Sequence, residues 1–319
     1  MEAKKTHQQE EAKSFPPSRI IVKDQFLAMP SIILGTGKGG QRQGQFNYPF
    51  GVAFDSKHKS IVVTDYNNDR LQLFSQQDGK FLSAFGSEGT NNGQFYCPKG
   101  VCIQPGTNNV IVTDRHRLQV FSVSTSSSGS SYFDHLFSVG SADPGSGPSQ
   151  FRMPRGICCT ARGDIIVADC FNNRMQMFDC KGRFLRAFGS QGHGNNRFQQ
   201  PWDVCVQEDA NRTIITDHSN HRLNVWSVDG CEPILTVPLQ SYPAGICKYP
   251  RTDRIVVSCS GSYNIKVFDC KTKNEWNVIQ EFGSFGSQPG QFDHPRGVCF
   301  DDRGVLAVAD HDNHRVQMF

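Results

Sequence analysis

The chain has 319 residues, of which 37% are hydrophobic and 20% are charged, and its formal net charge is +3. This composition is typical of a globular protein with a buried core, and it excludes a globally basic chain that binds polyanions over its whole surface. No apolar run approaches the roughly 18 residues of a membrane helix, so we expect no membrane span. Thirty glycines, sixteen prolines and twenty-four phenylalanines favour short strands joined by many turns.

The first 19 residues are polar, rich in glutamine, and end in Ser14-Phe15-Pro16-Pro17. They lack the apolar core of a signal peptide. We therefore predict a disordered tail or linker over residues 1–19 and a folded domain over residues 20–319.

A ten-residue motif, Asp217 to Trp226, places an arginine five residues and an aromatic residue nine residues after an aspartate. Copies run from Asp65 to Phe74, from Asp169 to Phe178 and from Asp310 to Phe319. A spacing that returns about every 50 residues is the signature of a repeat architecture. Because the Asp and Arg recur in most copies, we interpret them as a structural staple across a turn rather than as catalytic groups.

Each repeat begins with an aromatic residue and a Pro-x-Gly sequence, as in Phe46 to Gly51. Four short strands follow, which we call A, B, C and D; in the first repeat, strand B covers residues 61–65, C covers 71–74 and D covers 81–86. Asp78-Gly79 between strands C and D is typical of a hairpin turn. We predict blades at about 44–88, 94–141, 150–190, 197–237, 241–285 and 291–319, because four antiparallel strands repeated six times indicate a β-propeller.

The two ends of the chain complement each other. The sixth repeat stops at Phe319 without a strand D, and residues 31–36 resemble the missing strand. An N-terminal strand that completes the last blade leaves no open sheet edge. We therefore predict an all-β, six-bladed β-propeller whose ring is closed by a strand at about residues 31–36.

Five of the twelve cysteines lie two residues after the Gly of Pro-x-Gly, or after the Asp203 that replaces it. They are Cys102, Cys158, Cys205, Cys247 and Cys299. On a crowded inner strand a free cysteine serves as a small hydrophobic residue. Since equivalent positions on different blades are not placed to form disulfides, we expect a reducing compartment, the cytoplasm.

Three repeats depart from the pattern. The fifth has Cys259 and Asn264 in place of the Asp and Arg, and it begins with Tyr242-Pro243-Ala244-Gly245. The second is two residues short in its motif, and it contains a serine-rich insert, residues 122–131, that we predict to be a flexible surface loop. The fourth has Asp203 in place of the glycine.

Asn220-His221-Arg222-Leu223, the Pro-x-Gly-Val openings and the Phe-Gly-Ser endings resemble NHL repeats over nearly the whole chain. The sequence is most similar to the NHL propeller of TRIM-NHL proteins, a group that includes Brat-like translational repressors. Members of that group generally carry a RING domain, B-box and coiled coil, none of which occurs in this sequence. The resemblance therefore implies a monomeric propeller that is not an enzyme and has no cofactor, with any ubiquitin-ligase activity located elsewhere.

Strand direction predicts which loops share a face. Antiparallel order places the B–C turn and the Pro-x-Gly segment at the same end of each blade, around the channel mouth. The residues between Pro and Gly are Phe50, Lys99, Arg155, Trp202, Ala244 and Arg296. The residues after the repeat Asp, or its replacement, are Tyr66, Arg115, Cys170, His218, Ser260 and His311.

Cations in this set can neutralise phosphates, and each aromatic face can stack a base with a gain of roughly 1–3 kcal/mol. NHL propellers include RNA binders that use one face of the ring, and others thought to bind proteins. We therefore expect RNA contacts from nine residues, with Arg155 exposed: Arg155, Arg296, Lys99, Trp202, Phe50, Arg115, Tyr66, His218 and His311. We expect no metal at His218-x-x-His221 or His311-x-x-His314, because strand-turn geometry separates the side chains.

Three functions stay open on the sequence alone. The leading hypothesis is recognition of single-stranded RNA, with U-rich or loop elements of 3′ untranslated regions implied by the resemblance, in a repressor that recruits protein effectors. The alternative is a protein-interaction module that presents substrates to a TRIM-type ubiquitin ligase. The third, an enzyme of the propeller-lyase or hydrolase kind, lacks recognisable metal ligands.

Overall fold

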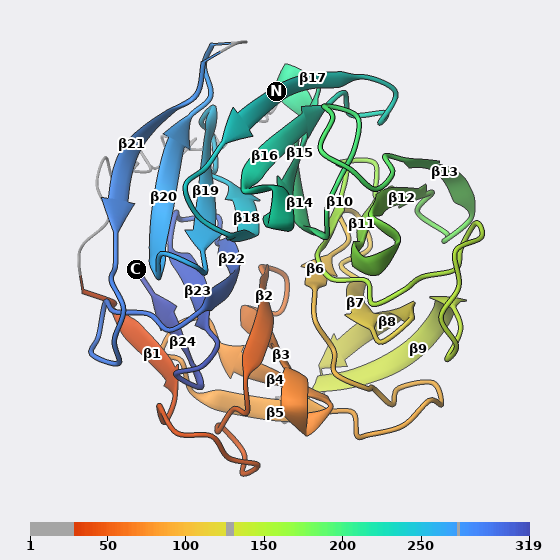
Figure 1. The fold of residues 1–319 in the computed structure, drawn as a ribbon. Helices are drawn as coiled ribbons and strands as arrows, with labels where there is room; N and C mark the ends of the chain where they lie inside the picture. Colours follow the sequence, from red (N-terminus) through yellow and green to blue (C-terminus); the bar gives the residue numbers. More distant parts are fainter. Residues whose placement is uncertain (1–28, 126–130, 273–274) are drawn as a thin grey trace, which may run out of the picture.

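The computed structural model describes residues 29–125, 131–272 and 275–319. The strands form six four-stranded sheets that surround a central axis (Figure 1). In each sheet the antiparallel strands follow the predicted A-to-D order, so the predicted all-β, six-bladed propeller is confirmed. The predicted tail, residues 1–19, lies outside the described residues.

The first three blades have these bounds. Blade one contains β2 (Pro49–Asp55), β3 (Ser60–Asp65), β4 (Arg70–Ser75) and β5 (Phe81–Phe85). Blade two contains β6 (Val101–Ile103), β7 (Val110–Asp114), β8 (Arg117–Thr125) and β9 (Ser131–Gly140). Blade three contains β10 (Ile157–Cys159), β11 (Ile165–Asp169), β12 (Arg174–Phe178) and β13 (Phe184–Phe188).

The remaining blades follow the same order. Blade four contains β14 (Pro201–Gln207), β15 (Arg212–Asp217), β16 (Arg222–Trp226) and β17 (Pro233–Pro238). Blade five contains β18 (Pro243–Lys248), β19 (Arg254–Cys259), β20 (Asn264–Asp269) and β21 (Asn277–Phe282). Blade six contains β22 (Pro295–Phe300), β23 (Leu306–Asp310), β24 (Arg315–Met318) and β1 (Ile32–Gly35).

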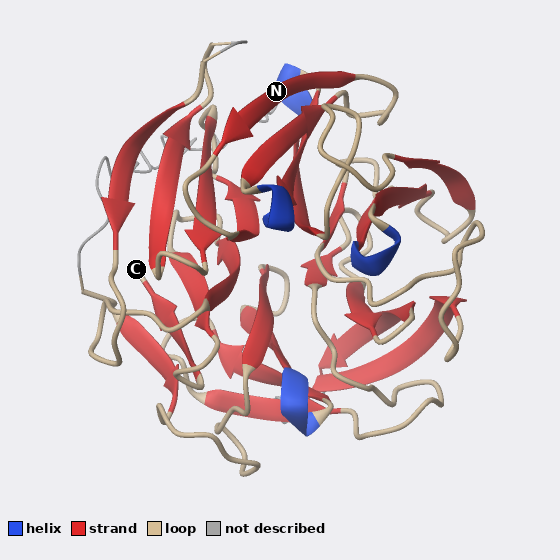
Figure 2. Ribbon diagram, viewed as in Figure 1, coloured by secondary structure: helices blue, strands red, loops and turns tan. Residues whose placement is uncertain are grey.

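Helical structure in the described residues is limited to short 3-10 turns (Figure 2). They are η1 (Tyr66–Asn68), η2 (Cys170–Asn172), η3 (Glu208–Ala210) and η4 (His218–Asn220). Three of them, η1, η2 and η4, form the B–C turns of their blades. None of these turns has the length or apolar character of a membrane-crossing helix.

The ring closes as the chain ends predict. Strand β1 pairs antiparallel with β24, with Ile32 opposite Met318 and Gly35 opposite Arg315. Figure 1 shows this red N-terminal strand beside the blue C-terminal strand. Leu34 of β1 is buried among side chains of blades one and six. The last blade is thus completed by the first strand, and the closing strand is confirmed.

The hydrophobic core lies between blades rather than within them. Val62 and Leu71 of blade one, for example, pack in one cluster with Val112 and Phe121 of blade two. Strand β3 is buried along its whole length, whereas the outer strand β5 alternates between half-buried and exposed side chains. No blade buries its apolar faces alone, so the ring is the unit of stability.

The opening aromatic of five repeats fits against a glycine of the preceding blade. The five rings are fully buried and belong to Phe46, Phe95, Phe151, Phe198 and Phe292. A Cβ on Gly189, which follows β13, would lie 2.2 Å from Cε2 of Phe198. Gly189 also has a φ of +80°, in the left-handed region that favours glycine. The Phe-Gly ending of one repeat and the aromatic opening of the next are therefore two halves of one contact.

Both halves of this contact are missing at the joint between blades four and five. Strand β17 ends at Pro238 instead of a Phe-Gly pair, and Tyr242, expected to be the opening aromatic, is 44% exposed. Tyr242 directly precedes its proline, whereas the other opening aromatics lie three residues before theirs. The expectation for Tyr242 is therefore wrong, and half-buried Leu239 packs into the core at this joint instead.

The two ends of the serine-rich insert belong to strands, whereas we expected a flexible loop. Strand β8 continues through residues 122–125, and β9 begins at Ser131. Residues 126–130 lie outside the described part of the chain. Phe133 of this extension stacks on Phe85 of blade one at a centroid distance of 4.6 Å. Apolar packing against the neighbouring blade explains why β8 and β9 are longer than the corresponding strands of the other blades.

We expect Gly189→Ala to reduce the free energy of unfolding by at least about 2 kcal/mol more than Gly106→Ala does. Both glycines have a φ of +80°, so the two variants share the same backbone strain. A Cβ on Gly106 meets no atom within 4 Å, whereas one on Gly189 meets the Phe198 ring. Urea denaturation of both variants measures the difference, and equal losses would contradict the proposed contact.

Candidate nucleic-acid interface

A buried Asp–Arg pair joins the B–C turn to the linker that precedes strand A. In blade four, Arg222 Nε donates to Asp217 Oδ2 at 2.6 Å, and its Nη atoms donate to three carbonyl oxygens of residues 193–197. Asp217 Oδ1 accepts the backbone N–H of Gln199 at 2.7 Å. Equivalent pairs are Asp65 with Arg70, Asp114 with Arg117, Asp169 with Arg174, and Asp310 with Arg315. The structural interpretation of these pairs therefore agrees with the contacts.

A hydroxyl on strand B fixes the Pro-x-Gly segment of the next blade. Thr64 Oγ1 accepts the N–H of Gly51 at 2.7 Å and donates to the carbonyl oxygen of Lys99 at 2.6 Å. A Cβ on Gly51 would lie 2.3 Å from that same oxygen, so the lack of a side chain at residue 51 makes room for this close approach. Comparable hydroxyl bonds reach the carbonyls of Arg155, Ala244 and Arg296. The inner strands therefore meet at the axis and direct the residue after each proline toward it.

Two aromatic rings fill the channel mouth. Phe50 of blade one and Trp202 of blade four come from opposite sides of the ring, yet their rings stack with centroids 6.1 Å apart and an interplanar angle of 9°. Both are only 6% exposed, and they form a small cluster with Ala244. We call this pair the aromatic plug.

Cations and histidines pack on the plug. The Arg155 guanidinium carbon lies 3.4 Å from the Trp202 ring centroid, and that of Arg296 lies 4.7 Å from it. The His218 ring stacks on Trp202 at 4.1 Å. On the Phe50 side, Tyr66 stacks at 5.9 Å and His311 meets the ring edge-on at 5.7 Å. Lys99 Nζ lies 5.3 Å from the Tyr66 centroid.

The structure thus brings together eight of the nine predicted residues, but it buries several of them. Lys99 is 1% exposed, and it lies beneath the surface with the plug instead of lining it. Arg155, expected to be exposed, is half-buried. The reason is that six loops converge on the axis, so long side chains fold over one another. The ninth residue, Arg115, lies instead over the Tyr96 ring at 4.5 Å.

The mouth concentrates positive charge. Among the described residues, no carboxylate lies within salt-bridge distance of Lys99, Arg155 or Arg296. Within the described part of the chain, the buried Nε atoms of both arginines and Nε1 of Trp202 have no hydrogen-bond partner. Such orphaned donors next to unpaired cations point to an anionic ligand.

Burial and mutual repulsion shift the pKa values of these groups. Burial, assisted by the Arg155 charge, lowers the pKa of Lys99 to about 8 and that of Arg296 to about 10. Burial, followed by the Arg296 charge, lowers the pKa values of His218 and His311 to about 3. Both histidines are therefore neutral near pH 7 and act as flat ring surfaces rather than as charges.

Comparison with known families agrees with this architecture. The sequence profile described as "6-bladed beta-propeller" matches residues 152–292, and the NHL repeat profile matches residues 292–319. The chain is therefore a six-bladed β-propeller with an NHL repeat at residues 292–319.

Several curated relatives resemble parts of this NHL propeller. It is 30% identical to protein brain tumor of Drosophila melanogaster over 141 residues, which cover 42% of this chain and 13% of that protein. It is 36% identical to the B-box type zinc finger protein ncl-1 of Caenorhabditis elegans over 177 residues, covering 54% and 18% respectively. The matches therefore span less than a fifth of either relative.

Solved structures show the same fold at low sequence identity. A virginiamycin B lyase from Staphylococcus aureus superimposes with a TM-score of 0.57 and 17% identity, covering 88% of this chain and 97% of that one. A chain of a nidogen/laminin complex gives a TM-score of 0.57 at 14% identity, covering 78% and 91% respectively. At these identities the likeness shows the fold alone.

Within each histidine pair of the NHL motifs, the two rings make different polar or stacking contacts. His218 stacks on Trp202, whereas His221 Nδ1 donates to the carbonyl oxygen of Ser241 at 3.1 Å. His311 Nδ1 donates to the carbonyl oxygen of Pro49 at 3.0 Å, whereas His314 Nδ1 accepts the N–H of Tyr48 at 3.1 Å. Both histidines of each pair also pack against a single tyrosine, which is Tyr242 for the first pair and Tyr48 for the second.

One group of potential metal ligands was not predicted from the sequence. Asp293, His294 and Asp312 place one ligand atom each within 4.8 Å of one another. His294 Nδ1 lies 2.8 Å from Asp293 Oδ1 and 2.6 Å from Asp312 Oδ2. The three residues come from two separate loops of blade six, so no spacing motif marks them.

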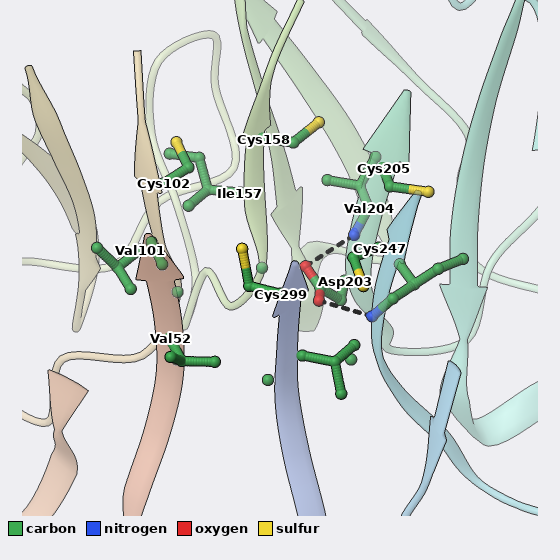
Figure 3. Close-up of a pocket in the computed structure, with 18 of the residues that line it drawn as sticks. Val52, Val101, Cys102, Ile157, Cys158, Asp203, Val204, Cys205, Cys247 and Cys299 are labelled. Carbon is green, nitrogen blue, oxygen red and sulfur yellow. Dashed lines mark hydrogen bonds between the residues drawn. The ribbon is translucent and has the colours of Figure 1, made fainter. Parts of the chain in front are cut away.

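A cavity of about 270 Å³ lies along the axis below the plug. It is lined by the inner strands, including the five repeated cysteines, and Figure 3 shows these side chains around the axis. All twelve cysteines are free thiols. The repeated positions thus supply small side chains to the channel wall.

Among the described residues, Asp203 supplies the one carboxylate in the wall of this cavity. Its Oδ1 accepts the N–H of Val204 at 2.8 Å, and its Oδ2 accepts the N–H of Ile246 in blade five at 3.0 Å (Figure 3). A Cβ on Gly156 would lie 1.9 Å from Asp203 Oδ1, so that glycine makes room for the carboxylate. Burial raises the pKa of Asp203 to about 7. The sequence marks this position as unusual but does not reveal the burial.

We expect Asp203→Asn to flatten the pH dependence of the free energy of unfolding. The pKa of Asp203 is about 7 in the folded chain and 3.8 ordinarily, so folding favours the neutral carboxyl group. Its contribution to stability is therefore complete below about pH 4 and is lost as the pH rises from there through about 7. The wild-type protein should lose about 4 kcal/mol from this group between about pH 4 and pH 8, and the variant should not. Denaturation at several pH values tests this, with exposed Asp209→Asn as a control that should retain the wild-type slope.

Proposed function

We propose that the mouth of this NHL propeller binds single-stranded RNA and that the propeller is the target-recognition part of a post-transcriptional repressor. The observation that carries the proposal is the set of three cations, Lys99, Arg155 and Arg296, held on aromatic rings without carboxylate partners. The resemblance to TRIM-NHL propellers supports the repressor role, with U-rich or loop elements of 3′ untranslated regions as targets. It also supports a cytoplasmic site of action and protein effectors as further partners.

Unpaired charges favour a polyanionic ligand. Arg155 and Arg296 repel each other across the plug, and this repulsion contributes to the lowered pKa of Arg296. A bound phosphate would offset the repulsion and accept hydrogen bonds from guanidinium groups. Because the site is partly desolvated, these interactions are stronger than they would be on an exposed surface.

Exposed aromatic residues at the same end of the blades can stack bases. Phe171 is 38% exposed and its ring centroid lies 6.0 Å from the Arg155 guanidinium carbon. Tyr96, Tyr242 and Phe285 are also exposed, at 40%, 44% and 63%. These four residues lie in linkers or B–C turns, but they were missed because they occupy neither of the repeat positions selected from the sequence. Each offers a platform for an unpaired base.

Exposed aromatic side chains also suit recognition of a protein, which is the alternative function. The two ligands differ in their dependence on salt. Contacts from Arg155 and Arg296 to single-stranded RNA, with Lys99 adding charge from beneath the surface, should give a slope of between about −1 and −2 in a plot of log affinity against log salt. A protein ligand held by aromatic contacts should show a weaker dependence.

We expect Arg155→Gln and Arg296→Gln each to weaken binding of RNA selected from a random pool by about tenfold or more and to reduce the salt slope. Glutamine is chosen because both arginines pack on Trp202, where a carboxylate would perturb the plug. Arg162→Gln is the matched control, since that side chain is 85% exposed and lies in the A–B turn of blade three, at the other end. Fluorescence anisotropy measures the affinities.

Two outcomes would contradict this prediction. If no RNA is enriched at low salt, the RNA function fails and protein recognition becomes the better account. If RNA binds but Arg162→Gln weakens it as much as the mouth variants do, the site lies elsewhere.

We expect RNA affinity to fall several-fold between about pH 7.4 and pH 8.8 because Lys99, with a pKa of about 8, loses its charge over this range. His218 and His311 are already neutral, and Arg296 remains largely charged. Lys99→Met should bind more weakly at pH 7.4 and lose most of the pH dependence. An unchanged pH dependence in Lys99→Met would contradict a role for this ammonium group.

A further inference from the structure

At the junction of blades two and three, two thiols touch. Cys102 Sγ on β6 and Cys159 Sγ on β10 are 3.7 Å apart. The two residues are 57 positions apart in the chain and come from inner strands of neighbouring blades. Both side chains are half-buried rather than fully enclosed. Cys102 lines the axial cavity, as Figure 3 shows.

The repeat pattern shows that this contact is special to one junction. Count positions in each blade from the Gly of Pro-x-Gly, or from Asp203 in blade four. The residue two positions after this point in one blade packs in the same cluster as the residue three positions after it in the next blade. Such pairs are Ala53 with Ile103, Cys158 with Val206, Cys247 with Phe300, and Cys299 with Phe54. The residues at the second of these positions are Phe54, Ile103, Cys159, Val206, Lys248 and Phe300. Only in blade three is this residue a cysteine, so only there does a repeated cysteine meet a second thiol.

We propose that Cys102 and Cys159 form a redox-active dithiol that closes to an inter-blade disulfide by exchange with a small dialkyl disulfide, such as glutathione disulfide. The thiolate of one cysteine attacks a sulfur of the oxidant, forms a mixed disulfide and releases one glutathione thiolate. The second cysteine thiolate then attacks the protein sulfur of the mixed disulfide and releases the second glutathione thiolate. Two electrons pass from the cysteines to the oxidant, and the two protons lost by the cysteines complete two glutathione thiols.

Distance and surroundings favour this pair over the other cysteines. Van der Waals contact between the two sulfurs means that small side-chain rotations and strand shifts can bring them to bonding distance. Contact with Cys159 and burial raise the pKa of the Cys102 thiol. Cys102 is therefore mainly protonated near neutral pH, and oxidation of the pair should be slow without a sustained oxidising buffer. Cys180 and Cys231 are exposed, but no thiol lies beside either of them among the described residues.

The cross-link would restrain the blades that carry two of the mouth cations. Lys99 lies three residues before Cys102, and Arg155 lies four residues before Cys159. A disulfide between β6 and β10 would also restrict the unfolded chain, which raises thermal stability. Formation of the bond and the rise in the unfolding temperature are independent of RNA binding.

The test incubates the whole chain in glutathione buffers of increasing oxidising strength, blocks free thiols and identifies linked peptides by mass spectrometry. Wild-type protein should yield a peptide that joins Cys102 to Cys159, and its unfolding temperature should rise by a few degrees and return with dithiothreitol. Cys102→Ser and Cys159→Ser should lose both effects. Cys158→Ser, which leaves the pair intact beside the changed residue, should retain both.

Three results would overturn the proposal. One is oxidation that yields only glutathione adducts of Cys180 and Cys231. Another is a disulfide that involves Cys158 in place of Cys159. The third is a linked peptide that persists in Cys159→Ser. Because each readout is made without RNA, failure of the dithiol and failure of RNA binding are separate findings.

Discussion

The buried Asp–Arg pair is the interaction on which the geometry of this propeller depends. Its guanidinium group satisfies three carbonyl oxygens of an irregular linker that would otherwise lack partners, as Arg222 does in blade four. Its carboxylate holds the backbone just before Pro-x-Gly, as Asp217 does through the N–H of Gln199. A buried ion pair adds little net stability compared with apolar packing, so its main effect here is to fix the position of the backbone. It fixes where strand A begins, and thereby which side chain reaches the axis.

Blade five lacks this pair, and its packing at the axis differs from that of the other blades. Cys259 and Asn264 replace the Asp and Arg, and Asn264 bonds instead to Ser262 and Glu281. The same blade lacks the buried opening phenylalanine, and its mouth residue is Ala244, the smallest of the six. Ala244 is fully buried beside Trp202 of blade four, the largest of the six. The indole therefore occupies space that a longer side chain on blade five would need. The changed motif and small mouth residue of blade five thus accompany the large aromatic residue of blade four, and the two blades pack together at the axis.

The fold could be predicted because its determinants are local and repeated. The Asp–Arg spacing, the Pro-x-Gly openings and the Asp-Gly turns each occur several times, and the two chain ends carry complementary parts of one blade. The properties of the mouth were harder to predict from the sequence, because they arise where six loops meet. Nothing near Lys99 in the sequence indicates that it is 1% exposed, and the stacking of Phe50 on Trp202 joins opposite blades. The contact of Cys102 with Cys159 likewise requires knowledge of which residues face each other across a junction. The repeated residues therefore predict the fold, whereas the properties of the site depend on residues that differ between the repeats.

The arrangement of charge limits how the mouth could hold a nucleic acid. Its cations converge on one aromatic plug instead of forming a track, so they can contact only a few phosphates. The electrostatic contribution to affinity is therefore modest, and much of the binding energy must come from elsewhere. The surrounding exposed rings, including Phe171 and Tyr242, can supply it only to bases whose faces are free. A duplex hides those faces within its own stack and would gain only the phosphate contacts. If RNA is the ligand, as we propose, this geometry favours an unpaired strand, because an unpaired strand combines an anionic backbone with accessible base faces.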